Sequence, residues 1–187
     1  MKGQTEILIS GFGGQGLLSL GKVLARAALS AGKHTTWFPS YGAEMRGGTA
    51  HCFVKISNSP IASPFIDYPD IAIIFNQPSL DKFKQKLKRA RLVIVNSDLI
   101  SGNPSLGNTK EVSLPFTKIA LDCGNIKVAN VVVLGVLTVL MPNLFNKKTL
   151  IEIIASIFKR KDILVQNLKA LDKGQTLVPR EKRGGKC

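Results

Sequence analysis

Apolar and polar positions along the first forty residues predict an alternating order of strands and helices. Residues 5–10 form a short apolar run that ends at Gly11, a pattern typical of a buried strand. Apolar residues between positions 17 and 28 then recur at helical spacing, and Gly32 ends this helix. Residues 34–40 predict a second strand, parallel to the first. A strand, a glycine-rich loop, a helix and a strand in this order open an α/β unit.

The pattern continues into the C-terminal part of the chain. Further strands are predicted at residues 50–57, 70–75, 91–96 and 111–116, with one helix at residues 76–87 and others from residue 117 onward, including 147–159. We therefore expect a single α/β domain, a three-layer α/β/α arrangement around a mainly parallel or mixed sheet. The domain should cover residues 1–178, and residues 179–187 should form a basic tail.

One apolar run, residues 128–141, has to be weighed as a membrane span. It contains 14 residues, fewer than the ~20 that a membrane-crossing helix needs, so we expect a helix or strand buried inside a layered domain. The N-terminal apolar stretch lacks the pattern of a signal peptide. The sequence therefore predicts a cytoplasmic protein without membrane contact.

The formal net charge of +14, from 26 basic and 12 acidic residues, favours an anionic partner. Nucleic acid is not expected, because the basic residues are dispersed, aromatic residues make up only 6% of the chain and no nucleic-acid motif is present. The densest basic stretch, residues 82–91, has six basic residues in ten. It predicts a solvated helix face, with a docking surface for an acidic partner subunit as the alternative.

The three cysteines, Cys52, Cys123 and Cys187, lie far apart in the chain and form no CxxC motif. This spacing argues against a disulfide framework, a zinc site and a four-thiolate iron–sulfur cluster. We therefore expect any electron-transfer centre to sit on another chain. The isolated His34 and His51 are predicted to be structural, and Cys52 to be a buried thiol.

The glycine-rich segment GFGGQG, residues 11–16, matches the dinucleotide-binding pattern and lies between a predicted strand and a predicted helix. Glycines let the backbone approach a phosphate closely, and the positive end of the helix stabilises its charge. A NAD site also needs an acidic residue at the end of the second strand, but that region reads TWFPSYGAE. An unspecified phosphate or diphosphate is therefore favoured over a dinucleotide, and a purely structural turn remains open.

Two other segments supply candidate site residues. The segment YGAEMRGGT, residues 41–49, places Glu44 and Arg46 between glycines, where Arg46 could clamp a carboxylate or phosphate or simply pair with Glu44. The segments 76–79 and 96–97 follow consecutive predicted parallel strands, at the sheet edge where open α/β sheets bind ligands. Helix capping and turn formation explain these two segments nearly as well.

Taken together, the motifs resemble the gamma subunits of 2-oxoacid:ferredoxin oxidoreductases. The resemblance rests on GFGGQG, PSYGAEMRGGTAHCFVKIS, IASP, FNQPSLDKF, VNSDLI and IALDCGNIKVANVVVLG, and covers the chain to about Gly135. It implies a complex of alpha, beta, gamma and delta-type subunits that oxidatively decarboxylates a 2-oxoacid to an acyl-CoA and passes electrons to ferredoxin. Thiamine diphosphate and iron–sulfur clusters would sit on the partner subunits, so this chain is not expected to be catalytic alone.

The resemblance also implies that this subunit packs beside the active site and helps to bind coenzyme A. The EMRGG segment favours 2-oxoglutarate as the substrate, while branched-chain 2-oxoacids and indolepyruvate stay open, as does a freestanding nucleotide- or phosphate-binding regulatory module. Ala43 departs from the proline expected in this family's loop. The predicted ligand-facing residues are Gly13, Gly14, Gln15, Gly16, Tyr41, Gly42, Glu44, Arg46, Gly47, Gly48, Thr49, Asn76, Gln77, Pro78 and Ser79.

Overall fold

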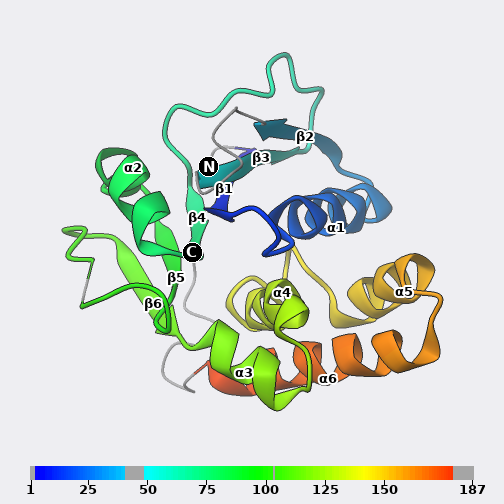
Figure 1. The fold of residues 1–187 in the computed structure, drawn as a ribbon. Helices are drawn as coiled ribbons and strands as arrows, with labels where there is room; N and C mark the ends of the chain where they lie inside the picture. The colour runs from blue at the N-terminus through cyan, green and yellow to red at the C-terminus, as the bar shows by residue number, and fades with distance from the viewer. Residues whose placement is uncertain (1–2, 41–48, 103, 179–187) are drawn as a thin grey trace.

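The computed structural model describes residues 3–40, 49–102 and 104–178 (Figure 1). Its elements in chain order are β1 (Gln4–Phe12), α1 (Leu17–Ser30), β2 (His34–Ser40), β3 (Thr49–Ser57), β4 (Ile71–Ile74), α2 (Gln77–Leu87), β5 (Leu92–Asn96), β6 (Lys110–Leu114), α3 (Phe116–Asp122), the 3₁₀ turn η2 (Ile126–Val128), α4 (Ala129–Leu140), α5 (Lys147–Ile157) and α6 (Lys161–Leu177). The predicted strands and the predicted helices through 159 are all present within a few residues. The last helix, α6, was not assigned separately from the sequence.

The six strands form one mixed sheet in the order β2-β3-β1-β4-β5-β6. The strands β1, β4, β5 and β6 run parallel to one another, whereas β3 pairs antiparallel with both β1 and β2. The second strand therefore runs in the direction of the first, as predicted, but β3 lies between them. Only residues 41–48 separate β2 from β3. A parallel neighbour would need a crossover of about a dozen residues or more, so the short connection gives an antiparallel pair.

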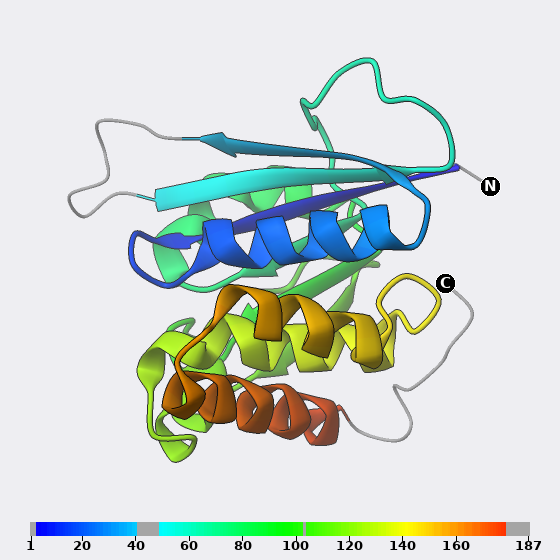
Figure 2. The same ribbon diagram turned by 90° about the vertical axis from the view of Figure 1, so that its right-hand side faces the viewer.

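Helices cover both faces of the sheet, which confirms the predicted α/β class. The helices α1 and α4 pack on one face and α2 packs on the other (Figures 1 and 2). Successive residues of the central strands point to opposite faces, so that Ile73 joins the α1 side and Ile74 the α2 side. The strands β4 and β5 are buried at every position, because helices cover both faces of the sheet. Parallel strands between two helix layers are apolar on both faces for this reason.

The apolar run that could have suggested a membrane span forms α4, which is buried along almost its whole length. It packs against α6 at two glycines. A Cβ atom on Gly135 would lie 2.1 Å from the Leu171 carbonyl oxygen, and one on Gly174 would lie 2.0 Å from the Val132 carbonyl oxygen. The two helices thus approach more closely than any larger residue would permit. In the part of the chain that the structure describes, no helix is long and apolar enough to cross a membrane.

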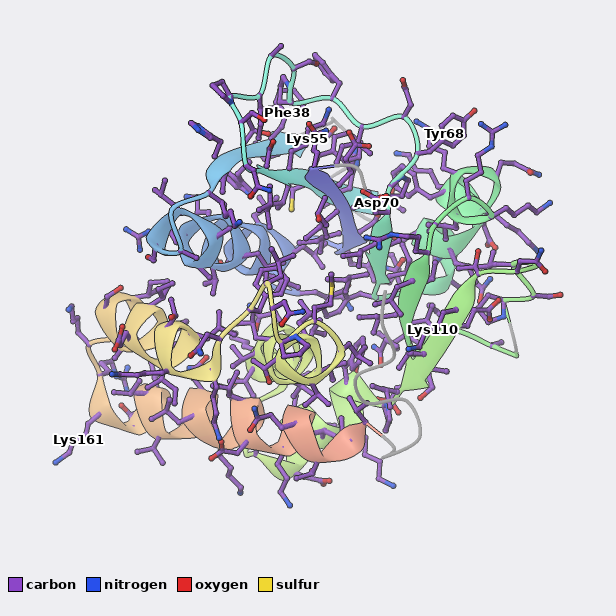
Figure 3. All side chains as sticks on the ribbon, turned by 180° about the vertical axis from the view of Figure 1, so that it is seen from behind. Phe38, Lys55, Tyr68, Asp70, Lys110 and Lys161 are labelled. Atoms are coloured by element: carbon purple, nitrogen blue, oxygen red, sulfur yellow. The ribbon has the colours of Figure 1, made fainter. Side chains whose placement is uncertain are left out.

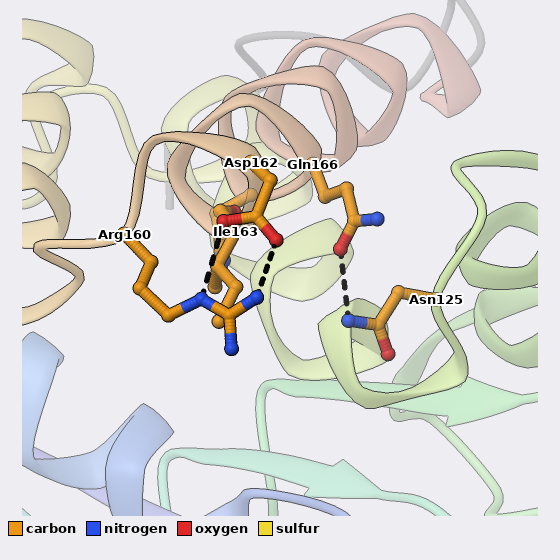
Figure 4. Close-up of polar contacts among 6 residues, drawn as sticks. Asn125, Arg160, Asp162, Ile163 and Gln166 are labelled. Carbon is orange, nitrogen blue, oxygen red and sulfur yellow. Dashed lines mark hydrogen bonds and ion pairs between the residues drawn. The ribbon is translucent and has the colours of Figure 1, made fainter.

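Polar contacts order the start of α6 and join the helix to the η2 turn (Figure 4). The Arg160 guanidinium, just before the helix, donates to the Asp162 carboxylate over 3.3 and 2.8 Å, and these bonds hold the pKa of Asp162 below its usual range. The Asn125 amide nitrogen donates to the Gln166 carbonyl oxygen over 3.0 Å, which joins the η2 turn to α6.

The segment between β3 and β4 packs on the α2 side of the sheet, at the β2 edge (Figure 3). Its Phe65 ring lies 5.0 Å from the ring of Phe38 on β2. On β3, Lys55 is buried and pairs with Glu6 of β1 over 3.1 Å. Asp70, at the end of the segment, accepts a bond of 2.9 Å from the Glu6 backbone N–H. Glu6, Lys55 and Asp70 thus lie toward the end of the strands opposite to the glycine-rich loop.

Candidate functional site

The adjacent parallel strands β1 and β4 end at the same edge of the sheet, and the chain leaves them toward opposite faces. After β1 the chain enters α1 on one face, and after β4 it enters α2 on the other. A change of direction between neighbouring parallel strands is the position at which open α/β sheets bind ligands, because the diverging connections leave a crevice there. The glycine-rich loop and the segment 76–79 therefore lie together at this edge, as the sequence predicted.

The glycine-rich loop connects β1 to α1 and uses backbone conformations that favour glycine. Gly14 has φ 90° and Gly16, the residue before α1, has φ 73°. Gln15 stabilises the turn, because its side-chain oxygen accepts a hydrogen bond of 2.7 Å from the Phe12 backbone N–H. A ligand contact of this side chain stays a prediction.

Two glycines of the loop meet different surroundings. A Cβ on Gly11 would lie 2.5 Å from the Gln15 side-chain oxygen and 2.7 Å from Cβ of Phe75, so this position is closed by neighbours. A Cβ on Gly14 would meet none of the described atoms within 4 Å. Among the described residues, no side chain caps the N-terminus of α1 either. The first N–H groups of this 14-residue helix have no intrahelical acceptor, as at any helix start, and Gly13 and Gly14 of the preceding turn are exposed.

The segment 41–49 leaves β2 and enters β3 at this same edge. Thr49, the first residue of β3, pairs with Phe12 at the end of β1. Of the residues predicted to face a ligand in this segment, only Thr49 can be placed. Tyr41, Gly42, Glu44, Arg46, Gly47 and Gly48 lie outside the described residues, as does the predicted basic tail.

The segment 76–79 begins α2, and its side chains make hydrogen bonds to other groups of the same chain. The Asn76 side chain caps the helix by accepting a bond of 2.9 Å from the Ser79 backbone N–H, and Pro78 occupies the first turn. The Gln77 side chain donates to Asp81 over 2.8 Å and accepts from the Ser101 backbone N–H over 3.2 Å. Capping, one of the two alternatives for this segment, is thus confirmed. A ligand role for the four residues stays a prediction.

Asn96 ends β5 and connects the neighbouring elements. Its amide nitrogen donates to the Phe75 carbonyl oxygen over 3.3 Å and to the Thr117 hydroxyl over 2.9 Å, while its oxygen accepts from the Phe116 backbone N–H over 3.1 Å. The side chain is fully buried. Asn96 therefore ties the ends of β4 and β5 to the start of α3 and keeps this edge of the sheet in place.

Cys52 and His51, neighbours in β3, both contact buried or aromatic side chains. Burial raises the pKa of the Cys52 thiol to about 12, so the thiol stays protonated near pH 7 and donates to the Leu17 carbonyl oxygen over 3.6 Å. The His51 ring lies 5.4 Å from the ring of Phe53 and 5.1 Å from that of Phe83, as expected for a structural residue. No group of three or more possible metal ligands occurs in residues 3–40, 49–102 and 104–178.

One residue beside the loop was not singled out from the sequence. Asn130, in the first turn of α4, donates a hydrogen bond of 3.1 Å from its amide nitrogen to the Gly16 carbonyl oxygen. Its signal in the sequence is that it is polar within the otherwise apolar run 128–137. The contact spans 114 positions of the chain, so only the fold reveals which backbone group it meets.

The fold and this edge define a class: an α/β domain in which a glycine-rich loop precedes a helix that has no side-chain cap among the described residues, at the point where neighbouring parallel strands lead to opposite faces of the sheet. The chain matches the model of the family described as pyruvate ferredoxin/flavodoxin oxidoreductase over residues 6–177. The chain belongs to this family, in which it corresponds to the gamma subunit of 2-oxoacid:ferredoxin oxidoreductases.

Two relatives illustrate the range of the family. The chain is 39% identical over 181 residues to the 2-oxoglutarate synthase subunit KorC of Methanocaldococcus jannaschii, covering 93% of this chain and 94% of KorC. It is 38% identical over 172 residues to the ketoisovalerate oxidoreductase subunit VorA of Methanothermobacter marburgensis, covering 91% of this chain but only 36% of VorA. The chain thus spans about a third of the length of VorA.

Solved structures give the same picture. The keto/oxoacid ferredoxin oxidoreductase gamma subunit from Geobacter sulfurreducens is similar with a TM-score of 0.77 and 31% identity, covering 91% of this chain and 95% of that one. The 2-oxoglutarate:ferredoxin oxidoreductase from Magnetococcus marinus, solved with 2-oxoglutarate, coenzyme A and succinyl-CoA bound, has a TM-score of 0.85 and 27% identity. The match covers 94% of this chain and 31% of the Magnetococcus chain.

Proposed function

We propose that this gamma subunit works in a complex that oxidatively decarboxylates a 2-oxoacid to an acyl-CoA and passes the electrons to ferredoxin. Its partners would be alpha, beta and delta-type subunits, which would hold thiamine diphosphate and the iron–sulfur clusters. The near end-to-end match with KorC and with the Geobacter gamma subunit supports this role, because both are separate subunits of similar length.

We further propose that the subunit helps to bind coenzyme A through the glycine-rich loop. The observation that carries this proposal is the N-terminus of α1, which has no side-chain cap among the described residues and follows the exposed Gly14, where a Cβ would meet none of the described atoms within 4 Å. A diphosphate fits such a position, because the helix N–H groups can donate to its oxygens while the helix dipole and the basic chain stabilise its charge. The likeness to a Magnetococcus enzyme that holds coenzyme A supports the same ligand.

For the substrate we propose 2-oxoglutarate. KorC, a 2-oxoglutarate synthase subunit, matches this chain over nearly the whole length of both proteins, whereas VorA, a ketoisovalerate oxidoreductase subunit, matches over about a third of its own length. Branched-chain 2-oxoacids are the second candidate, because the two relatives are almost equally identical to this chain.

Reconstitution with the partner subunits tests the function and the substrate together. The complex should reduce ferredoxin in a coenzyme A-dependent reaction, with kcat/KM at least tenfold higher for 2-oxoglutarate than for 3-methyl-2-oxobutanoate, pyruvate or indolepyruvate. A higher value for any of the other three acids would contradict the proposed substrate. Purification of the native chain as a stable protein without partners would instead favour the freestanding phosphate-binding module.

A further inference from the structure

The Asn130 side chain lies against the glycine-rich loop, and one of its two polar atoms has a hydrogen-bond partner among the described residues while the other has none. Its amide nitrogen donates to the Gly16 carbonyl oxygen, while its amide oxygen is buried and has no hydrogen-bond partner among the described residues. The residue is 7% exposed. Buried polar atoms nearly always have a partner, so an exception beside a candidate ligand site points to a role in that site.

The orientation of this amide is fixed by its surroundings. If the amide were turned over, its oxygen would face the Gly16 carbonyl oxygen, and two acceptors would oppose each other. A Cβ on Gly16 would lie 2.5 Å from the Asn130 amide nitrogen and 2.9 Å from Cγ, so the amide rests directly against the last residue of the loop. Since both polar atoms belong to one planar amide, the unpartnered oxygen also lies beside the start of α1.

The helix that carries Asn130 is rigidly placed. Within α4, Gly135 lies against α6 so closely that no side chain would fit between the helices. The position of Asn130 relative to Gly16 is therefore set by the packing of the helical layer. An amide held in this way is suited to positioning a ligand, because little side-chain freedom has to be lost on binding.

We propose that Asn130 is a binding residue of the glycine-rich loop, whose amide oxygen accepts a hydrogen bond from a hydroxyl or amide N–H next to the phosphate of the ligand. A fully ionised phosphate has no donor and would be repelled by this oxygen, so Asn130 selects a ligand that carries a donor beside its charge. Coenzyme A has such groups on both sides of its diphosphate, in the ribose and in the pantetheine arm. The inference rests on the proposed function and specifies how the same site would recognise its ligand.

The variant Asn130→Leu removes both polar atoms at similar volume. The Gly16 carbonyl oxygen would keep its other bond, from the Leu20 backbone N–H at 2.9 Å, and the unpartnered oxygen would be gone. We therefore expect the thermal midpoint of the subunit to stay the same or to rise, whereas the Kd of the reconstituted complex for coenzyme A should rise about tenfold, the affinity that one neutral hydrogen bond contributes. The KM for the 2-oxoacid should change less than twofold.

Two competitive inhibitors identify the donor. Adenosine 3′,5′-bisphosphate retains the ribose side and 4′-phosphopantetheine the pantetheine side, and the inhibitor that carries the donor should lose affinity for Asn130→Leu while the other keeps it. A lower thermal midpoint together with unchanged affinity for coenzyme A and for both inhibitors would overturn the proposal and leave Asn130 a packing residue. If the leucine variant does not fold, the affinities of Asn130→Ala for coenzyme A and for both inhibitors are measured instead and interpreted in the same way.

The loop variant Gly14→Val separates this inference from the function on which it rests. If Gly14→Val leaves coenzyme A binding unchanged, the loop does not hold this ligand and both proposals fail. If Gly14→Val weakens binding and Asn130→Leu does not, only the role of Asn130 fails.

Discussion

Two helices begin at the same edge of the sheet, and they begin in opposite ways. The helix α2 carries its own cap, because Asn76 accepts from the Ser79 backbone N–H and Pro78 occupies the first turn. The helix α1 has no side-chain cap among the described residues and starts from glycines with positive φ. A helix that satisfies its first N–H groups internally has little to offer a ligand, whereas one that leaves them open provides donors and positive potential. The comparison favours α1 as the ligand-binding helix.

The largest effect on stability is expected from giving the start of α1 a side chain. Gly16→Ala places a Cβ at φ 73° and against the Asn130 amide, so we expect a loss of about 2–4 kcal/mol in the free energy of unfolding. Urea unfolding of the isolated subunit measures it. In the double variant with Asn130→Ala, the part of the lost free energy of unfolding that comes from the clash should be recovered. If the losses of the two single variants simply add, the contact between position 16 and the Asn130 amide is not tight.

A smaller effect is expected from removing the cap at the start of α2. Asn76→Ala should lower the free energy of unfolding by about 1–2 kcal/mol, since a buried capping bond is lost. Asn146→Ala is the matched control, because Asn146 caps the exposed start of α5 by accepting from the Lys148 backbone N–H, and should cost about 0.5–1 kcal/mol. If Asn76→Ala also weakens coenzyme A binding in the complex, the predicted ligand role of segment 76–79 holds and the contrast between the helices is weaker.

Much of this contrast could be predicted from the sequence, because its signals are local. The glycines of residues 11–16 and the pair Asn76 and Pro78 mark the two helix starts without knowledge of the fold. The place of β3 between β1 and β2 could not be predicted in the same way, since strand order depends on pairing between distant segments. The contact of Asn130 with Gly16 joins positions 114 apart, so its role follows from helix packing and not from a motif.

The Kd of the reconstituted complex for coenzyme A, measured with Gly14→Val and Gly32→Val, tests the central claim most directly. Both glycines have positive φ, and a Cβ on either would meet none of the described atoms within 4 Å, but Gly32 lies beyond the other end of α1. Both variants should therefore carry similar backbone strain. The open start of α1 predicts that Gly14→Val raises the Kd at least a hundredfold, or abolishes binding, while Gly32→Val changes it less than twofold. Equal Kd values for the two variants would contradict a coenzyme A site at the glycine-rich loop.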